Sequence, residues 1–377
     1  QRDARKRKEE LRWARISEGQ QRLDAMLKVA EPMLGIRSSQ LDNGDDLLPV
    51  KNGLVDLTTG RLLEHDRERY FTRGISVEFN PAARAPKWEA FIREVTNGDG
   101  ELEHFLQVAL GYSLTGRVDE QCFFFCYGSG RNGKSTLFAA VERIFAGFFG
   151  KVPIETFLAS YSYGEAPTPA RMTMQGKRLI VSSEIPDGRR LNEQLIKDLT
   201  GGDTIAGRRL HGDIEQFKMR AKIWLYGNAK PTIEGGEAIW RRVKLIPFTK
   251  IFSQPRKMSE ILAEFEEEKS GILSWLVLGA VLWYKQGLPE SVAVQRETEI
   301  YRNENDMLGE FLGANCESGV EFSAEKHQLY KVYKIHCETT GEKARSQAWF
   351  VRQLTQRGYQ LGGSGRSKVL GLRLKPT

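Results

Sequence analysis

Cysteine and histidine are scarce in this sequence, with four and five of them in 377 residues. Four cysteines are too few for a disulfide framework, and the neighbouring His336 and Cys337 have no second pair at zinc-site spacing. Cys122 and Cys126 flank phenylalanines of an expected strand, where we predict that they pack in the core. The chain is therefore expected to fold around a hydrophobic core in a reducing compartment.

Long apolar runs are also absent. No stretch of 18 or more apolar residues occurs, which excludes a membrane-spanning helix of that kind. The first residues, "QRDARKRKEE", are charged and lack the apolar segment of a secretory signal. We expect a protein of the cytoplasm, in a bacterial host cell, with no membrane partner. Because the chain begins with Gln rather than Met, we also expect it to be a piece of a longer protein.

Positive charge is concentrated at one end of the chain. Residues 321–377 contain eleven lysines and arginines against four glutamates, a net charge of +7 that equals the net charge of the whole chain. A basic end domain indicates a polyanionic partner such as nucleic acid. The alternative is a basic surface without a partner.

The segment "YGSGRNGKSTLF", residues 127–138, matches the phosphate-loop pattern G-x-x-x-x-G-K-[ST]. Its glycines allow backbone N–H groups to point at phosphate oxygens, while Lys134 reaches the phosphates and Ser135 reaches Mg²⁺. An apolar strand, "CFFFCY", precedes the loop, and a helical apolar pattern follows it, as the motif requires. The alternative is a glycine-rich turn that binds nothing. We predict an ATP and Mg²⁺ site formed by Gly128, Ser129, Gly130, Arg131, Asn132, Gly133, Lys134, Ser135 and Thr136.

Three later segments also have the apolar character of buried strands. "KRLIVSSEI" ends near Glu184, whose carboxylate could hold Mg²⁺ and orient a water, or could be a surface residue past a strand. "KIWLYGNAKP" ends near Asn228, whose amide could contact a phosphate, or could be part of a turn. "IWRRVKLIPF" begins with Arg241 and Arg242, which could act in a neighbouring subunit's site or be paired surface residues.

Two basic segments are candidates for binding DNA. Two strand-like arms within residues 203–218 flank a tip that contains Arg208, Arg209 and His211. Such a hairpin could track a nucleic-acid backbone, although polar residues are also common at hairpin tips. Near the end of the chain, a helix with a start signal at Ser346 and a stop signal at Gly358 precedes two strands around a basic tip.

The helix and hairpin at the end of the chain predict a winged-helix-like domain. In such a domain the helix enters a DNA groove while Arg366 and Lys368 contact phosphates. The alternative is a module that docks another protein.

The sequence of elements predicts an α/β protein, a P-loop core with a central parallel sheet preceded by a small α+β and helical domain. Asn52-Gly53 and Thr59-Gly60 are turn signals within that small domain. The expected parts are a charged helical linker or collar (1–44), the small domain (45–120), the nucleotide-binding core (121–290) and the basic domain (291–377).

The order and spacing of these segments resemble superfamily 3 helicases, which are ring-forming AAA+ motors of viruses and mobile elements. A more specific likeness, over nearly the whole chain, is to the helicase part of phage and plasmid primases, the poxvirus-type primase–helicase family. "GSGRNGKST" resembles its Walker A loop, "RLIVSSE" its Walker B strand and "LIKDLTGGDTIAGRRLH" its insertion with a DNA-contacting hairpin. "WLYGN" resembles its sensor strand and "WRRVKLIPF" its arginine-finger strand.

The resemblance implies a role for each residue that matches a motif. Lys134 and Ser135 bind phosphate and Mg²⁺, Glu184 polarises the attacking water, and Asn228 is the sensor. Many relatives carry two acids where this chain has Ser183 and Glu184. Glu184 therefore either serves both metal and water, or Ser183 holds the metal through a water.

Other roles implied by the resemblance involve a neighbouring subunit or DNA. Arg242 is the arginine finger, with Arg241 as the second choice, and Lys197 also reaches the neighbour's nucleotide. Arg208, Arg209 and His211 face DNA.

The family likeness predicts an ATP-dependent helicase that forms a ring, a hexamer in most relatives, and translocates on single-stranded DNA during replication of a phage, plasmid or other mobile element. A primase domain upstream on the same polypeptide is expected. The main alternative is a replication initiator that binds ATP and melts an origin without processive unwinding. A P-loop kinase of small molecules and a structural DNA-binding ring with a degenerate ATPase are two further alternatives.

Overall fold

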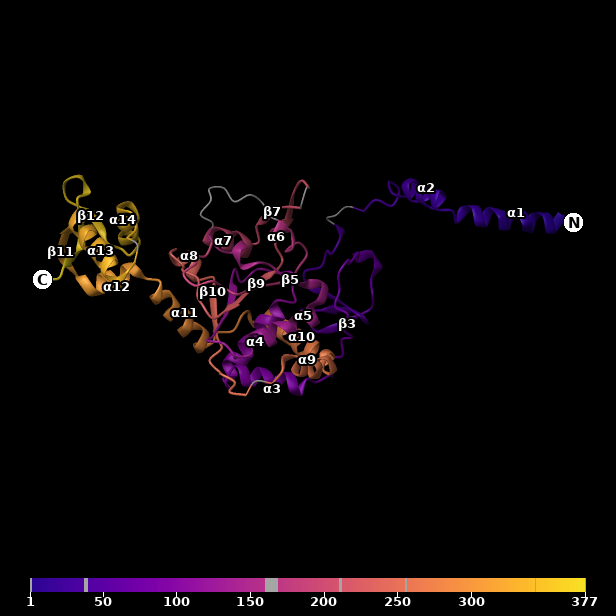
Figure 1. Ribbon diagram of the computed structural model, residues 1–377, viewed down its shortest axis with the longest axis horizontal. Coiled ribbons are helices and arrows are strands. Elements are labelled where there is room, and N and C mark those ends of the chain that lie inside the picture. The colour runs from indigo at the N-terminus through magenta and orange to yellow at the C-terminus, as the bar shows by residue number, and fades with distance from the viewer. Residues whose placement is uncertain are drawn as a thin grey trace.

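The computed structural model describes residues 2–36, 40–159, 169–209, 212–254, 256–342 and 344–376. A central α/β body lies between two extensions (Figure 1). The helices α1 (Arg2–Ser17) and α2 (Gln20–Ala30) extend from one side of this body, and the C-terminal unit comes after α11 (Val292–Glu304) on the other side. The charged helix expected at the N-terminus is thus two helices, which are separated at Gly19.

The central sheet contains five parallel strands. Their order is β10 (Val243–Pro247), β4 (Phe123–Tyr127), β9 (Lys222–Gly227), β6 (Leu179–Ser183) and β5 (Phe149–Lys151). Parallel strands are covered on both faces, which explains why these segments are apolar without alternation. The prediction of an α/β core with a central parallel sheet is confirmed. All five carboxyl ends lie at one edge, the usual position of a ligand site in such sheets.

Two hydrophobic clusters cover the two faces of the sheet. On one face, Phe124 stacks on Trp224 with ring centres 4.3 Å apart, while Phe123 and Phe125 point to the other face. The helices of the first face are α3 (Pro86–Val95), α4 (Gly100–Tyr112), α5 (Lys134–Phe145), α9 (Met258–Glu267) and α10 (Lys269–Gln286). The second face carries α7 (Glu193–Gly201), α8 (Glu237–Trp240) and α11. A separate short helix, α6 (Pro169–Met172), lies beside the hairpin described below.

The segment before the central sheet shares its core. It contains an antiparallel sheet of β1 (Leu47–Val50), β2 (Gly53–Asp56) and β3 (Arg61–Leu63). The predicted turns at Asn52-Gly53 and Thr59-Gly60 join these strands and are confirmed. Leu48 and Val55 belong to the same cluster as Phe124. Residues 45–120 therefore pack as part of the central body.

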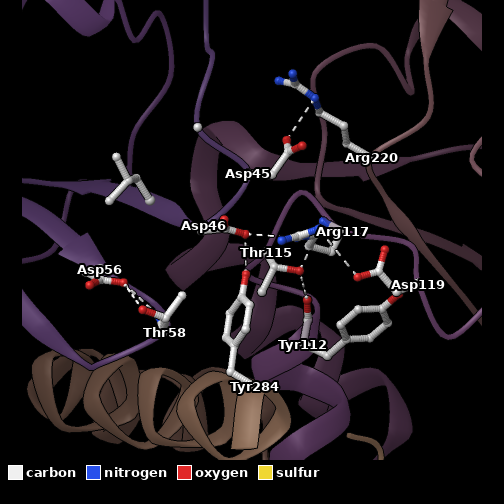
Figure 2. A network of polar contacts seen from close by, with 12 residues as sticks. Asp45, Asp46, Asp56, Thr58, Tyr112, Thr115, Arg117, Asp119, Arg220 and Tyr284 are labelled. Atoms are coloured by element: carbon white, nitrogen blue, oxygen red, sulfur yellow. Dashed lines mark hydrogen bonds and ion pairs between the residues drawn. The ribbon is translucent and has the colours of Figure 1, made fainter.

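A polar network fastens this segment to the rest of the body (Figure 2). Asp46 accepts hydrogen bonds from the Arg117 guanidinium, at 3.0 Å, and from the Tyr284 hydroxyl, and Asp45 pairs with Arg220 at 3.1 Å. These residues come from four distant parts of the sequence, so none could be paired from the sequence alone.

Two buried cations lie beside this network. Arg178 donates to Leu114 O at 2.6 Å, and Lys222 Nζ donates to Thr115 O at 2.5 Å and Arg117 O at 3.0 Å. Burial lowers the pKa of Arg178 to about 10 and lowers the pKa of Lys222 strongly. Both side chains donate hydrogen bonds to carbonyl groups of the segment that follows α4. They therefore hold that segment against the beginnings of β6 and β9.

The C-terminal unit has a hydrophobic core of its own, which includes Leu308, Phe311 and Leu372. Its sheet has the antiparallel order β11 (Cys316–Glu325), β13 (Lys368–Leu374) and β12 (Gln360–Gly362). Its helices are α12 (Met307–Asn315), α13 (Lys326–Thr340) and α14 (Gln347–Gln356).

Three features of this unit were expected from the sequence: a helix, a hairpin and a border at residue 291. The predicted helix is confirmed as α14, since the Ser346 side chain accepts from Trp349 N and Gly358 has a φ of 92°. The predicted hairpin is confirmed as β12 and β13. The expected border at residue 291 differs from the structure, because Tyr301 of α11 is buried in the central body and Thr298 binds Leu245 N.

The predicted hairpin before β9 is formed by β7 (Thr204–Arg208) and β8 (Ile214–Lys218), which pair antiparallel. Among the described residues, no helix is long and apolar enough to cross a membrane.

Candidate active site

The phosphate-loop segment joins β4 to α5 and depends on glycine at two close approaches. A Cβ on Gly128 would lie 2.2 Å from Asn132 Nδ2 and 2.4 Å from Phe248 O. Gly133 has a φ of 84°, and a Cβ there would lie 2.5 Å from a methyl group of Val95. Because Asn132 Nδ2 also donates to Phe248 O at 3.1 Å, the loop is held in place by a side chain of its own.

Lys134, at the first position of α5, is buried and directed into the loop. Its ammonium donates to Gly128 O at 2.9 Å, Asn132 Oδ1 at 2.7 Å and Asn228 Oδ1 at 3.1 Å. All three acceptors are neutral, and burial lowers the pKa of Lys134 to about 8. The site thus presents a desolvated cation to which phosphate oxygens would bind strongly.

Most of the residues predicted around Lys134 line one cavity of about 1500 Å³, although Gly128 and Ser129 are not part of its lining. Ser135 and Thr136 line it from α5, Ser183 and Glu184 from the end of β6, and Asn228 from the end of β9. β9 lies between β4 and β6 in the sheet, so its carboxyl end brings Asn228 beside both other segments. Three segments that are far apart in the sequence thus meet at one edge of the sheet, as the strand order requires.

Glu184 has an unusual backbone for its residue type. Its φ is 62°, in the left-handed region, which costs roughly 1–3 kcal/mol for a residue other than glycine. The residue is exposed at the cavity, directly after Ser183 at the end of β6. Strained residues of this kind are concentrated at functional sites, which agrees with a carboxylate placed for chemistry.

The oxygen donors fit a magnesium ion that arrives with a nucleotide. The described residues contain no group of three or more His, Cys, Asp and Glu side chains that could hold a metal alone. Mg²⁺ is commonly held by one or two protein oxygens together with phosphates and waters. The Ser135 hydroxyl and the Glu184 carboxylate at the same cavity meet that requirement.

A further part of the cavity lining is formed by residues that no catalytic motif of the sequence identifies. Phe91 and Glu94 come from α3, Phe252 comes after β10, Arg256 lies just before α9 and Glu264 lies within it. Arg256 and Glu264 form a paired contact at 3.1 and 2.6 Å. The backbone bond from Phe252 N to Arg131 O, at 2.9 Å, places this part of the lining beside the phosphate loop.

The residues predicted to act on a neighbour's site lie outside this cavity. Lys197 lies half-buried on α7. Arg242 is buried, and its guanidinium donates to Thr200 Oγ1 at 3.1 Å and to Ala238 O at 2.6 Å in the same chain. Arg241, the second choice, is exposed, so the geometry favours Arg241 as the guanidinium available to another subunit.

The candidate DNA-binding residues lie on two separate hairpins. In the first, Arg208 Nε donates to Gly212 O at 3.0 Å, and Arg209 pairs with Glu215 at 2.6 Å; His211 is outside the described residues. In the C-terminal unit, Arg366 and Lys368 lie at the start of β13 or just before it. Lys368 is 3.8 Å from Glu325 and remains half exposed.

Nucleotide affinity is expected to fall as the pH rises above about 8. The free protein holds Lys134 with a pKa of about 8, and a bound polyphosphate would raise it. Below that pH the ammonium is already charged, whereas above it each bound nucleotide requires the uptake of a proton. The dissociation constant should then rise by about tenfold per pH unit. A fluorescent ATP analogue titrated from pH 7 to 10 measures this, and an unchanged affinity would contradict it.

Comparison with known proteins found two family models that match parts of this chain. A family model described as D5 N terminal like matches residues 1–97, and a model of a family of unknown function matches residues 126–242. A putative helicase, L207/L206, of Acanthamoeba polyphaga mimivirus is 26% identical over 298 residues, which are 72% of this chain and 31% of the relative. Primase D5 of fowlpox virus is 28% identical over 174 residues, 44% of this chain and 21% of that relative.

A solved structure shares the fold. The apo structure of the NrS-1 C-terminal region has a TM-score of 0.53 and 11% identity, and the match covers 81% of this chain and 80% of that one. The fold is that of an α/β protein with a P-loop-like core. Together, the D5 N terminal like match, the sequence relatives and this fold support a poxvirus-type primase–helicase family.

Both curated relatives are much longer than this chain, which spans less than a third of the length of each. Both also come from eukaryotic viruses, so they give no support to the expected bacterial host.

Proposed function

We propose that this chain is the ATP-hydrolysing motor of a replicative primase–helicase and that it translocates on single-stranded DNA. The observation that supports this most is the convergence of Lys134, Ser135, Glu184 and Asn228 at one edge of the central sheet. A cation, a hydroxyl, a carboxylate and a neutral amide in one cavity form the set of groups that phosphoryl transfer to water needs.

Each group has a distinct task in this proposal. Lys134 and the backbone N–H groups of the loop bind the phosphates, and Asn228, which already contacts Lys134, holds the terminal phosphate. Glu184 accepts a proton from the attacking water, and Ser183 beside it is available to bind the metal through a water. Mg²⁺, when bound with the nucleotide, neutralises charge on the phosphates.

Assembly of several subunits completes the proposed site. The core acts as an AAA+ motor, and a ring, with a hexamer as the expected form, places Arg241 or Arg242 and Lys197 against the next subunit's nucleotide. The β7–β8 hairpins would then line a central channel for DNA, and the winged-helix-like C-terminal unit would contact duplex or forked DNA through Arg366 and Lys368. A primase domain upstream on the same polypeptide is part of this proposal.

ATP hydrolysis by the wild-type chain should increase when single-stranded DNA is added. Replacing Glu184 with glutamine should lower turnover by about 10²-fold or more, because the amide cannot accept the proton. Nucleotide binding should persist in this variant. A release assay for inorganic phosphate measures turnover, and titration with a fluorescent ATP analogue measures binding. Glu155→Gln is the control, because Glu155 is exposed and does not line the cavity.

If turnover did not respond to DNA, the proposed motor function would be wrong. An enzyme acting on a small molecule would then be favoured. An origin-melting initiator remains the alternative function, favoured by the basic C-terminal unit. Strand displacement on forked DNA separates the two, because an initiator would bind the fork without unwinding it processively.

A further inference from the structure

Lys230 is a cation of the cavity that no sequence motif identifies. It comes two residues after Asn228, lines the cavity, and keeps only 15% of its side chain exposed. Its ammonium lies 4.7 Å from the ring centre of Tyr127, the residue directly before Gly128, and 5.3 Å from that of Tyr301. A desolvated ammonium beside the phosphate loop is well placed to contact an anionic ligand.

The charged partner of Lys230 comes from the last residue of α11. Lys230 Nζ forms an ion pair with Glu304, which also lines the cavity and is about half exposed. Two uncharged contacts join the same end of α11 to the segment after Asn228. They are the bond from the Tyr301 hydroxyl to Pro231 O and the bond from Ile233 N to Asn305 Oδ1, at 2.8 Å.

This end of α11 leads directly into the C-terminal unit. α11 ends at Glu304 and α12 begins at Met307. Between them, Asp306 accepts from Gly309 N at 2.9 Å, as the cap of α12, and pairs with Arg357 of the C-terminal unit. Glu234, four residues after Lys230, pairs with Arg345 of the same unit. The Lys230–Glu304 contact therefore lies close in the sequence to both connections to the C-terminal unit, which are the segment between α11 and α12 and the Glu234–Arg345 pair.

We propose that Lys230 responds to the nucleotide: the phosphates take its ammonium from Glu304 and release the end of α11. The inference depends on the proposed function. Glu304 is about half exposed and carries a single negative charge that water screens, whereas a polyphosphate carries several negative charges. The phosphates therefore bind the Lys230 ammonium more strongly than the Glu304 carboxylate does. Loss of the pair leaves this end of α11 attached through its two uncharged contacts alone. The segment between α11 and α12 then moves more easily, so that occupation of the nucleotide site alters the placement of the C-terminal unit.

Replacing Lys230 with methionine, and separately Glu304 with glutamine, tests this inference. The affinity for a fluorescent ATP analogue with Mg²⁺ should fall about tenfold to a hundredfold in Lys230→Met, the usual effect of one charged hydrogen bond. It should rise in Glu304→Gln, because the competitor is gone. Lys269→Met and Glu266→Gln remove an exposed ion pair at the start of α10 and serve as matched controls.

Hydrogen exchange separates this mechanism from a purely structural role. In the wild type, the nucleotide should speed the exchange of amides in residues 300–315. Lys230→Met should show no such response, and Glu304→Gln should exchange fast even without nucleotide. If the wild type binds nucleotide and Lys230→Met binds equally with the same exchange response, this inference is wrong while the proposed function stands. If the wild type binds no nucleotide, both fail.

Discussion

Replacing Lys134 with alanine is expected to lower ATP hydrolysis by about 10²–10³-fold, the usual loss when one preorganised electrostatic group is removed. The ammonium is buried and donates to three neutral acceptors, so its charge is free to stabilise phosphate. Steady-state phosphate release and equilibrium binding of a fluorescent ATP analogue measure the loss.

The variant should remain folded. Removing the side chain also removes the cost of burying a charge, which offsets the hydrogen bonds that are lost. Lys151→Ala is the matched control. Lys151 is an exposed lysine at the end of β5, and it pairs with Glu142 of α5, the helix that begins at Lys134. Activity of Lys134→Ala equal to that of Lys151→Ala would show that the phosphate loop does not carry the reaction.

Mixing two inactive variants should restore ATP hydrolysis if the site is shared between subunits. Arg241→Ala is expected to lower turnover by about 10³–10⁵-fold, the range known for arginine fingers. Lys134→Ala subunits still carry Arg241, so a neighbour that lacks Arg241 but retains Lys134 regains a complete site. Phosphate release from mixtures at several ratios, with total protein held constant, measures the recovery.

Arg242 provides the comparison within this experiment. Its guanidinium binds Thr200 and Ala238 in its own chain, so Arg242→Ala should lower thermal stability more than Arg241→Ala does. If mixing rescues Arg242→Ala and not Arg241→Ala, Arg242 leaves its buried position in the assembly and is the finger. If neither variant is rescued and both retain activity, the site is complete within one chain.

The amino-acid sequence determined the local features of this protein. The Gly-x-x-x-x-Gly-Lys-Ser spacing and the apolar runs before and after it were sufficient to predict β4, the loop and α5, because these depend on neighbouring residues. The same holds for the turns at Asn52-Gly53 and Thr59-Gly60 and for the Ser346 cap of α14. Glu184 and Asn228 could be chosen because each comes after a buried strand, and parallel strands end at one edge.

Only the tertiary structure decided which distant residues meet and which are exposed. The order of strands placed β9 between β4 and β6 and so brought Asn228 to Lys134. Packing buried Arg242 and left the adjacent Arg241 exposed, although the two residues have the same chemistry. It also attached α11 to the central body and set Glu304 against Lys230. Contacts of this kind arise from the burial of whole helices and sheets, and no short-range pattern in the sequence encodes them.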